Sequence, residues 1–360
     1  MTRRQTSLAG AALLAILLTG GLVVWFSESV QDALMARVIA GRAAQRRSLH
    51  NPEALNVVFC GTGSPLPDPA RSQPCIAVYA GTELLLVDAG GGAASRLTML
   101  RAPLEQLSGV LLTHFHSDHI GGLGDVVLQS WAAGRHAALP VYGPEGVARV
   151  TEGFMAAFAL DASYRTAHHG QALMPPGGAR LTPHTVAVPD ADAVVTVLER
   201  GQLRVQAFRV DHSPVDPAYG YRVDYRGRSV VFSGDTIQQD ILARVGEGAD
   251  LMVHEALSPH MMLAVADGLE AAGDAQRAQI VRDTLSYHAT PVEAAETANA
   301  AHVRLLVYSH VVPPPPNAVA ERMFLRGVDA VRDHDVVLGF DGLHVELPVG
   351  STEVHQHDLR

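Results

Sequence analysis

The sequence predicts an α/β fold for most of the chain, preceded by one N-terminal apolar helix. From residue 51 onward, short β-rich runs that end in glycine or proline alternate with helix-like segments. Residues 5–27, in contrast, carry no charge at all. The chain has 360 residues, of which 48% are hydrophobic and 18% charged, so it can bury a large core. We expect a helix over 1–27, a polar helix-prone linker over 28–50 and a globular domain over 51–360.

The apolar run from Leu8 to Phe26 is long enough to cross a bilayer, because it would span about 30 Å as a helix. Arg3 and Arg4 precede it, as positive residues do on the cytoplasmic side of a membrane. The sequence therefore predicts a single-pass anchor in the cell membrane, with the following domain outside the cytoplasm in the periplasm. The alternative is a signal peptide whose cleavage releases the domain into the periplasm, although no clear A-x-A site follows the run.

Within the domain, the pattern of apolar runs and turn residues sets the expected order of the elements. The expected helices cover 124–135, 145–168 and 291–301, and the last begins with Pro291, a residue favoured in the first turn. The expected strands are 56–63, 75–81, 83–92, 109–114, 139–144, 203–213, 220–235, 250–256, 304–310 and 334–347.

The charge balance argues against a nucleic-acid partner. The formal net charge is −10, and no cluster of basic residues stands out along the sequence. Because binding to a polyanion usually needs a basic stripe, we expect no nucleic acid among the partners.

The chain has two cysteines, which are close in sequence. Cys60 ends the first expected strand and Cys75 begins the second. If these strands are neighbours, the two sulfurs can pair in an oxidising compartment. In a reducing compartment they would be two buried thiols, and the sequence alone leaves both states open.

Metal-binding side chains gather where the expected strands end. The stretch LLTHFHSDHIGGL (111–123) holds three histidines and an aspartate within six positions. Later strands also end in imidazoles or carboxylates. Because a strand delivers its last side chains to the rim of a sheet, residues far apart in sequence can meet there. Five imidazoles and two carboxylates would suit two zinc-type ions. The side chains of this kind at strand ends are Asp88, His114, His116, Asp118, His119, His212, Asp235, His254, Glu255 and His310.

HFHSDH resembles the H-x-H-x-D-H signature of the metallo-β-lactamase fold superfamily. Within that superfamily the chain is most similar to the branch of tRNase Z and the zinc-dependent arylsulfatases, through GTGSPLPDPARS, VDAGGG, FSGDT, VHEAL and HATPVEAAE. The likeness spans roughly residues 55–347. It implies an αββα sandwich, in which two sheets lie face to face with helices outside and a dinuclear metal site at one sheet edge.

The resemblance also implies a role for each site residue. The ions would be two Zn²⁺, with Mn²⁺ or Fe²⁺ as alternatives, and they would activate a water that attacks an ester. Glu255 would orient His288, and His288 would protonate the leaving group; Asp118 is the third residue that we expect to be catalytic. His114, His116 and His212 would hold the first ion, Asp118, His119 and His310 the second, and Asp235 would bridge both.

We expect a metal-dependent hydrolase of small esters, most like an exported arylsulfatase. Only residues 213–234 separate His212 from Asp235, which leaves no room for the long arm that tRNase Z enzymes commonly place there. The alternatives are a phosphodiesterase or lactonase of the same fold, a tRNase Z-type 3′ tRNA-processing endonuclease, and a non-catalytic binding protein. The last is disfavoured because all seven ligands are kept. The expected partners are a small-molecule ester, the membrane through the N-terminal helix, and a second copy in a homodimer.

Overall fold

A computed structural model describes residues 22–44 and 51–360, and the chain divides into two units, residues 1–48 and 49–360. In the first unit, residues 22–26 are helical and are followed by α2 (Glu28–Ala44). Most of the predicted membrane span, residues 8–21, lies outside the described residues. Among the helices that are described, none combines the length and the apolar character needed to span a bilayer.

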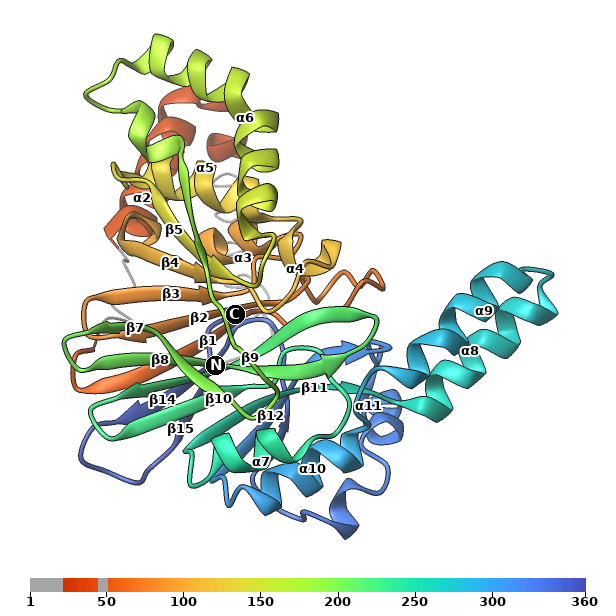
Figure 1. The fold of residues 1–360 in the computed structure, drawn as a ribbon. Helices are drawn as coiled ribbons and strands as arrows, with labels where there is room; N and C mark the ends of the chain where they lie inside the picture. Colours follow the sequence, from red (N-terminus) through yellow and green to blue (C-terminus); the bar gives the residue numbers. More distant parts are fainter. Residues whose placement is uncertain (1–21, 45–50) are drawn as a thin grey trace, which may run out of the picture. The chain divides into compact units, whose positions relative to one another are not determined.

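The second unit is built on two β-sheets that lie face to face, with helices on both outer faces (Figure 1). This confirms the predicted αββα sandwich. One sheet has eight strands in the order β15-β14-β1-β2-β3-β4-β5-β6, and the other has seven in the order β13-β12-β11-β10-β9-β8-β7. The strands of the first sheet are β1 (Ala54–Gly61), β2 (Cys75–Ala80), β3 (Glu83–Val87), β4 (Leu107–Leu111), β5 (Leu139–Gly143), β6 (Leu181–Thr185), β14 (Leu343–Pro348) and β15 (His355–Asp358). Those of the second are β7 (Val194–Arg200), β8 (Leu203–His212), β9 (Val215–Tyr225), β10 (Arg228–Phe232), β11 (Leu251–Leu257), β12 (Leu305–Val312) and β13 (Val336–Leu338).

The helices of this unit cover the outer faces of the sheets or project from them. They are α3 (Ala93–Met99), α4 (Ser117–Ile120), α5 (Leu123–Ala133), α6 (Val147–His169), α7 (Asp240–Gly246), α8 (Pro259–Ala271), α9 (Ala275–Asp283), α10 (Pro291–Ala300) and α11 (Ala318–Phe324). Short 3₁₀ turns occupy Leu104–Gln106, Pro176–Ala179, Thr284–Ser286 and Val328–Ala330.

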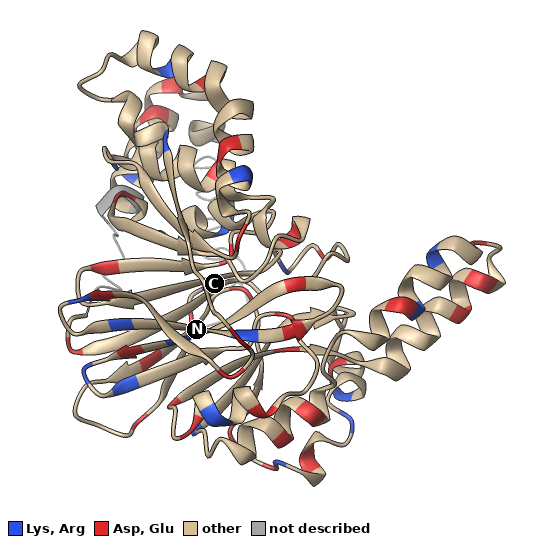
Figure 2. Ribbon diagram, in the orientation of Figure 1, with Lys and Arg blue, Asp and Glu red and all other residues tan. Residues whose placement is uncertain are grey.

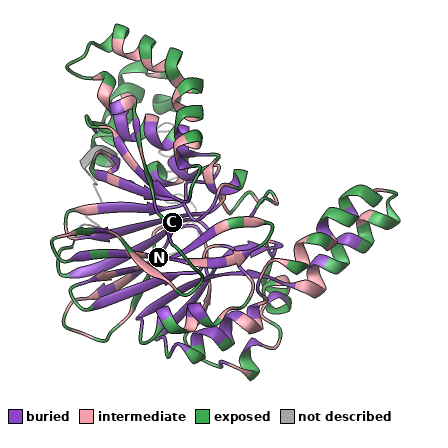
Figure 3. Ribbon diagram, viewed as in Figure 1, coloured by how far each residue is buried: buried purple, intermediate pink, exposed green. Residues whose placement is uncertain are grey.

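Alternation along the strands divides the apolar side chains between separate core layers. In β1, Val57 and Phe59 point into the core between the sheets, while Val58 and Cys60 point toward the helices that cover the outer face. This is the period of two expected for a strand buried on both faces. The outer layer of the other sheet packs against α7, α10 and α11. Figure 3 shows the result: the strands are mostly buried, whereas α6, α8 and α9 are largely exposed.

The structure differs in several places from the elements expected from the sequence. β6, β7 and β15 were not among the expected strands, and residues 334–347 contain parts of two strands, β13 and β14. Residues 220–235 do not form one strand, because β9 and β10 are joined by a tight turn at Arg226 and Gly227, which have φ values of 48° and 82°. Positive φ at both central residues is typical of the hairpin turn that matches strand twist. In addition, α8 and α9 form a helical hairpin between β11 and α10, and this hairpin projects from the sandwich (Figure 1).

Candidate metal centre

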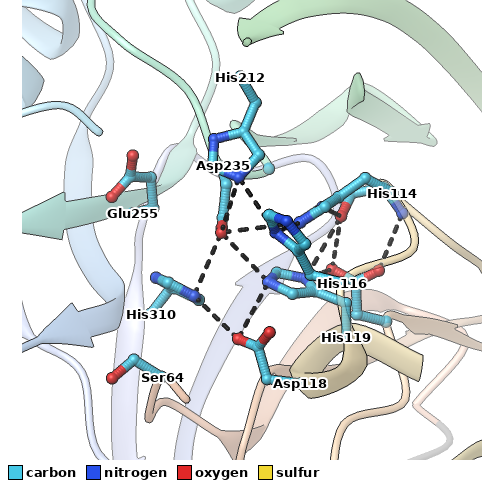
Figure 4. A network of polar contacts seen from close by, with 12 residues as sticks. Ser64, His114, His116, Asp118, His119, His212, Asp235, Glu255 and His310 are labelled. Atoms are coloured by element: carbon cyan, nitrogen blue, oxygen red, sulfur yellow. Dashed lines mark hydrogen bonds and ion pairs between the residues drawn. The ribbon is translucent and has the colours of Figure 1, made fainter. Parts of the chain in front are cut away.

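The seven predicted ligands converge at one edge of the sandwich, at or just beyond the ends of four strands (Figure 4). His114 follows β4, and the single-turn helix α4 carries Asp118 and His119. His212 ends β8, Asp235 follows β10 and His310 lies in β12. The side chains form two groups that could each hold a metal ion: His114, His116, His212 and Asp235, and Asp118, His119 and His310.

In the first group, His116 presents its Nδ1 atom to two other imidazoles. This atom lies 3.0 Å from Nε2 of His114 and 3.3 Å from Nε2 of His212. Asp235 Oδ2 lies 3.9 Å from Nε2 of His114 and 3.8 Å from Nε2 of His212. Donors bound at 2.0–2.2 Å to a tetrahedral ion are about 3.3–3.6 Å apart, so these four atoms are close to a tetrahedral set.

In the second group, the donor atoms are closer still to that geometry. Asp118 Oδ2 lies 3.5 Å from His119 Nε2 and 3.2 Å from His310 Nε2. Asp235 Oδ2 lies 3.3 Å and 3.2 Å from the same two nitrogens. His119 Nε2 is buried and makes no hydrogen bond within the described part of the chain, as expected for an atom whose partner is an ion.

A single oxygen atom, Oδ2 of Asp235, belongs to both donor sets. It lies 3.8–3.9 Å from the Nε2 atoms of His114 and His212 on one side and 3.2–3.3 Å from those of His119 and His310 on the other. The side chain is 3% exposed, so solvent does not compete for this oxygen. A carboxylate in this position can bridge two ions, and the residues present therefore fit a dinuclear zinc-type centre.

Protonation states also suit metal binding. Burial lowers the pKa of His114, His116 and His212 below that of an ordinary imidazole, so these rings are neutral at pH 7. Neutral imidazole is the form that binds metals. Burial alone would raise the pKa of Asp235, but the adjacent His310 and His119 outweigh it and hold this pKa well below its usual value. Asp235 is therefore an ionised carboxylate.

The second nitrogen of three ligand rings is held by a neighbouring group. Thr113 Oγ1 lies 3.0 Å from Nδ1 of His114, and the carbonyl of Tyr287 lies 3.0 Å from Nδ1 of His212. Asp88 Oδ2 lies 2.8 Å from Nδ1 of His119. Such contacts fix the tautomer and the orientation of a ligating ring. Each leaves Nε2 as the atom that faces the site.

Asp88 occupies a special backbone position. Its φ is +59°, and its carboxylate also accepts hydrogen bonds from the backbone N–H and the hydroxyl of Thr113, at 2.8 Å and 2.9 Å. Aspartate tolerates the left-handed region better than most residues. The strand end at β3 therefore turns sharply and aims this carboxylate at the metal centre.

Glu255 and His288 meet beside the centre, as the resemblance implied. Oε1 of Glu255 lies 3.0 Å from His288 Nδ1, and it also accepts hydrogen bonds from the backbone N–H groups of Thr236 and Ala289, at 3.1 Å and 3.0 Å. Burial alone would lower the pKa of His288, but the glutamate beside it outweighs this effect and raises the pKa to about 9. His288 is therefore protonated at neutral pH and can act as an acid.

Sequence reasoning did not identify several of the groups that position these side chains. Thr113 and Thr236 lie next to chemically obvious residues, but threonine at a strand end is common and carries no specific signal. The carbonyl of Tyr287 and the N–H of Ala289 are backbone groups. They have no side-chain signature, and they can be found only once the fold places them.

Comparison with known proteins assigns the chain to a family. Residues 84–311 match the beta-lactamase superfamily domain. Ribonuclease Z of Mycobacterium bovis (strain BCG / Pasteur 1173P2) is 38% identical over 262 residues, which cover 72% of this chain and 86% of that protein. Ribonuclease Z of Mycolicibacterium gilvum is 36% identical over the same length, with coverages of 72% and 85%.

Two solved structures share the fold. Human tRNase Z, short form, has a TM-score of 0.58 at 20% identity and covers 82% of this chain and all of its own. The metallo-β-lactamase fold protein YhfI from Bacillus subtilis has a TM-score of 0.58 at 20% identity and covers 81% of this chain and 99% of its own.

These relatives overturn two expectations drawn from the sequence. The expected activity, an arylsulfatase-like hydrolysis of small esters, is wrong, because the relatives at 36–38% identity are Ribonuclease Z enzymes. The expectation of a small-molecule substrate and no nucleic-acid partner is wrong for the same reason. Both rested on the absence of an arm between His212 and Asp235 and on the total charge, and total charge says little about the field at one site.

The protein is a metal-dependent hydrolase of ester bonds. Its N-terminal half supplies the HFHSDH ligands and its C-terminal half supplies Asp235, the Glu255–His288 pair and His310, all within or beside the matched region. The chain belongs to the metallo-β-lactamase superfamily, in the branch of the Ribonuclease Z enzymes.

Proposed function

We propose that the protein is an endonuclease of the Ribonuclease Z type, which hydrolyses a phosphodiester bond at the 3′ side of precursor tRNA. The observation that carries this proposal is the shared Oδ2 atom of Asp235 between two donor sets, beside the Glu255–His288 pair. It occurs in a chain 38% identical to a protein named Ribonuclease Z.

The chain's own residues divide the chemistry between them. The first ion would be held by His114, His116 and His212, the second by Asp118, His119 and His310, and both by Asp235. Two zinc-type ions bound there would lower the pKa of a bound water toward about 7 and attract the oxygens of the phosphate.

His288 would give its proton to the departing oxygen of the RNA. Because its Nδ1–H is held by Glu255, the proton available for transfer is the one on Nε2. The negative glutamate also stabilises the imidazolium before transfer.

The projecting α8–α9 hairpin would not serve as a basic RNA-binding arm. Figure 2 shows acidic and basic residues together along it, and both of its arginines are ion-paired. Arg277 lies 2.5 Å from Asp274, and Arg282 pairs with Asp267 and Glu270 at 3.0 Å and 2.5 Å. Within the described residues 259–283, the hairpin therefore offers no unpaired arginine to an RNA phosphate.

Cleavage of a precursor tRNA tests the proposal. A 5′-labelled precursor with a 3′ trailer should be cut at one position, and Asp235→Asn should abolish the cut. His168→Gln/His169→Gln, a pair of exposed histidines at the end of α6, is the matched control and should cut normally. If the precursor stays intact while the same enzyme hydrolyses bis(4-nitrophenyl) phosphate, precursor tRNA is not the substrate. The assignment as a metal-dependent hydrolase would still hold.

We also propose that residues 8–26 anchor the chain in the cell membrane, with the domain on the periplasmic side. The uncharged run and the preceding Arg3 and Arg4 support this topology. So does the disulfide between Cys60 and Cys75, because disulfides persist mainly outside the reducing cytosol. A periplasmic domain would not meet cytoplasmic precursor tRNA, so the topology test also decides whether precursor tRNA can be the substrate in the cell.

A further inference from the structure

A second group of potential metal ligands lies far along the chain from the centre described above, on the hairpin of β14 and β15. Its members are Glu346 of β14 and His355 and His357 of β15. Glu346 is directly opposite His355 in the antiparallel register, and His357 is two residues further along the same strand. Because side chains two residues apart share a face of a sheet, all three project on one side of the hairpin.

The donor atoms are spaced as one ion would require. Glu346 Oε2 lies 3.5 Å from His357 Nε2 and 3.9 Å from His355 Nδ1. Donors around a tetrahedral zinc-type ion are about 3.3–3.6 Å apart, so a small closure of the two histidines completes the set. The side chains of His355 and His357 are 45% and 49% exposed, so an ion can enter directly from solvent.

Two neighbouring side chains orient the donor atoms of this group, as neighbours of metal ligands do. Nε2 of His355 lies 3.1 Å from Oε2 of Glu353, which leaves Nδ1 directed toward Glu346. A ligating histidine commonly donates its other N–H to a carboxylate in this way. Asn51 donates its amide to Oε1 of Glu346 at 3.2 Å, so Oε2 is the oxygen that remains for the ion.

The turn that carries Glu353 is itself fixed by a buried cation. The guanidinium of Arg228 is 2% exposed and donates to the carbonyls of Pro348, Ser351 and Glu353. The position of this turn relative to β14 is therefore set by a contact within the fold. Exposed ion pairs add little stability by themselves. The ion pairs of Glu346 therefore do not explain why neighbouring groups orient the donor atoms of this cluster.

We propose that Glu346, His355 and His357 form a separate binding site for one borderline divalent cation such as Zn²⁺, Ni²⁺ or Cu²⁺. Two imidazoles and a carboxylate are suited to these ions, and three protein ligands leave a position for water. The bound ion would fasten β15, the edge strand of the eight-stranded sheet (Figure 1), to β14. This site does not depend on the activity proposed above.

Metal stoichiometry tests the proposal with Zn²⁺ alone as the probe. The full chain in mild detergent, equilibrated at low micromolar free Zn²⁺, should bind one equivalent more than His355→Gln/His357→Gln. His168→Gln/His169→Gln, which removes two exposed histidines elsewhere, should match the unmodified chain. Glu353→Gln keeps all three ligands and should weaken binding of the additional equivalent by about 10–100-fold. Equal stoichiometry in the unmodified chain and His355→Gln/His357→Gln would overturn the site.

Hydrogen exchange locates the effect. At a Zn²⁺ concentration ten times the dissociation constant, local opening of residues 355–358 should slow by about tenfold in the unmodified chain. It should not change in His355→Gln/His357→Gln. Zn²⁺ that slows exchange equally in both proteins would show that the ion acts elsewhere and would also overturn the proposal.

Discussion

His288 Nδ1 lies 3.0 Å from Glu255 Oε1, and these two residues stand on either side of the α8–α9 hairpin in the sequence. The glutamate is held by two backbone N–H groups as well as by the imidazole. Its position is therefore set by the fold and does not depend on the substrate.

Replacement of the acid should slow the reaction without emptying the metal centre. His288→Ala is expected to lower kcat by about 10²–10⁴-fold, the usual contribution of a positioned general acid. The loss should be much smaller for bis(4-nitrophenyl) phosphate, whose leaving group needs no proton. The measurement is kcat on both substrates, with metal content as the control. Equal losses on both would remove His288 from this role.

Replacement of the orienting carboxylate should change the pH profile. Glu255 raises the pKa of His288 to about 9, so His288 keeps its proton until the pH rises through that value. In Glu255→Gln this support is lost, the pKa of His288 falls, and the alkaline limb of kcat should move to lower pH. Rate profiles from pH 6 to pH 10 check the direction. An unmoved limb, with unchanged metal content, would mean that another group sets it.

Removal of metal should abolish hydrolysis, and readdition should restore it. The His355→Gln/His357→Gln variant lacks the separate site proposed on β15. It should bind two zinc-type ions, because the seven ligands of the centre exceed what one tetrahedral ion can use. Asp235→Asn should weaken both sites, and His310→Ala only the second. Elemental analysis after dialysis decides this. A stoichiometry of one or less, with Asp118 and His310 replaceable at no cost to binding, would contradict a dinuclear centre.

The disulfide should contribute measurably to stability. Cys60 and Cys75 are bonded with a Cα–Cα distance of 5.0 Å and a sequence separation of 15. Closing a loop of this length contributes about 3 kcal/mol in the chain-entropy model. Reduction should lower the free energy of unfolding of the intact domain, measured in urea, by about this amount. Cys60→Ala/Cys75→Ala should be insensitive to reductant, and an equal response of the two proteins would contradict the assignment.

The topology can be decided with alkaline phosphatase, which is active only after export. Fused behind residue 50, it should be active, and the native chain should fractionate with the membrane. An inactive fusion would place the domain in the cytoplasm. An active fusion with a soluble mature chain that begins near residue 27 would indicate signal cleavage.

The sequence was most informative where strands are apolar and end in unusual residues. LLTHFHSDH combines a buried run with metal ligands, so both β4 and the centre could be predicted from it. β6, β7 and β15 were not predicted. β6, LTPHT, contains a proline, and β15, HQHD, is polar and exposed throughout, so neither of these two shows the apolar pattern of a strand. Tertiary pairing, not local preference, makes them strands.

The substrate could not be read from the sequence for a different reason. The short His212–Asp235 interval was predicted correctly in outline, since β9 and β10 occupy it without an arm. The inference from it was wrong, because a missing arm removes one way of holding RNA without removing the phosphodiester chemistry. The motifs identify the residues that surround the reacting atoms. The surface that selects a substrate is built from many separate segments of the chain.

The α8–α9 hairpin gives the protein a place where length can vary freely. One end of this segment is fixed at Glu255 in β11 and the other at His288. The contact between these two residues holds the base of the hairpin together. Lengthening a closed loop costs little, about 0.6 kcal/mol for each doubling. Residues added at the tip, near Gly273, would leave the acid and its carboxylate in register. A grafted recognition segment there could change what the enzyme binds while preserving how it cuts.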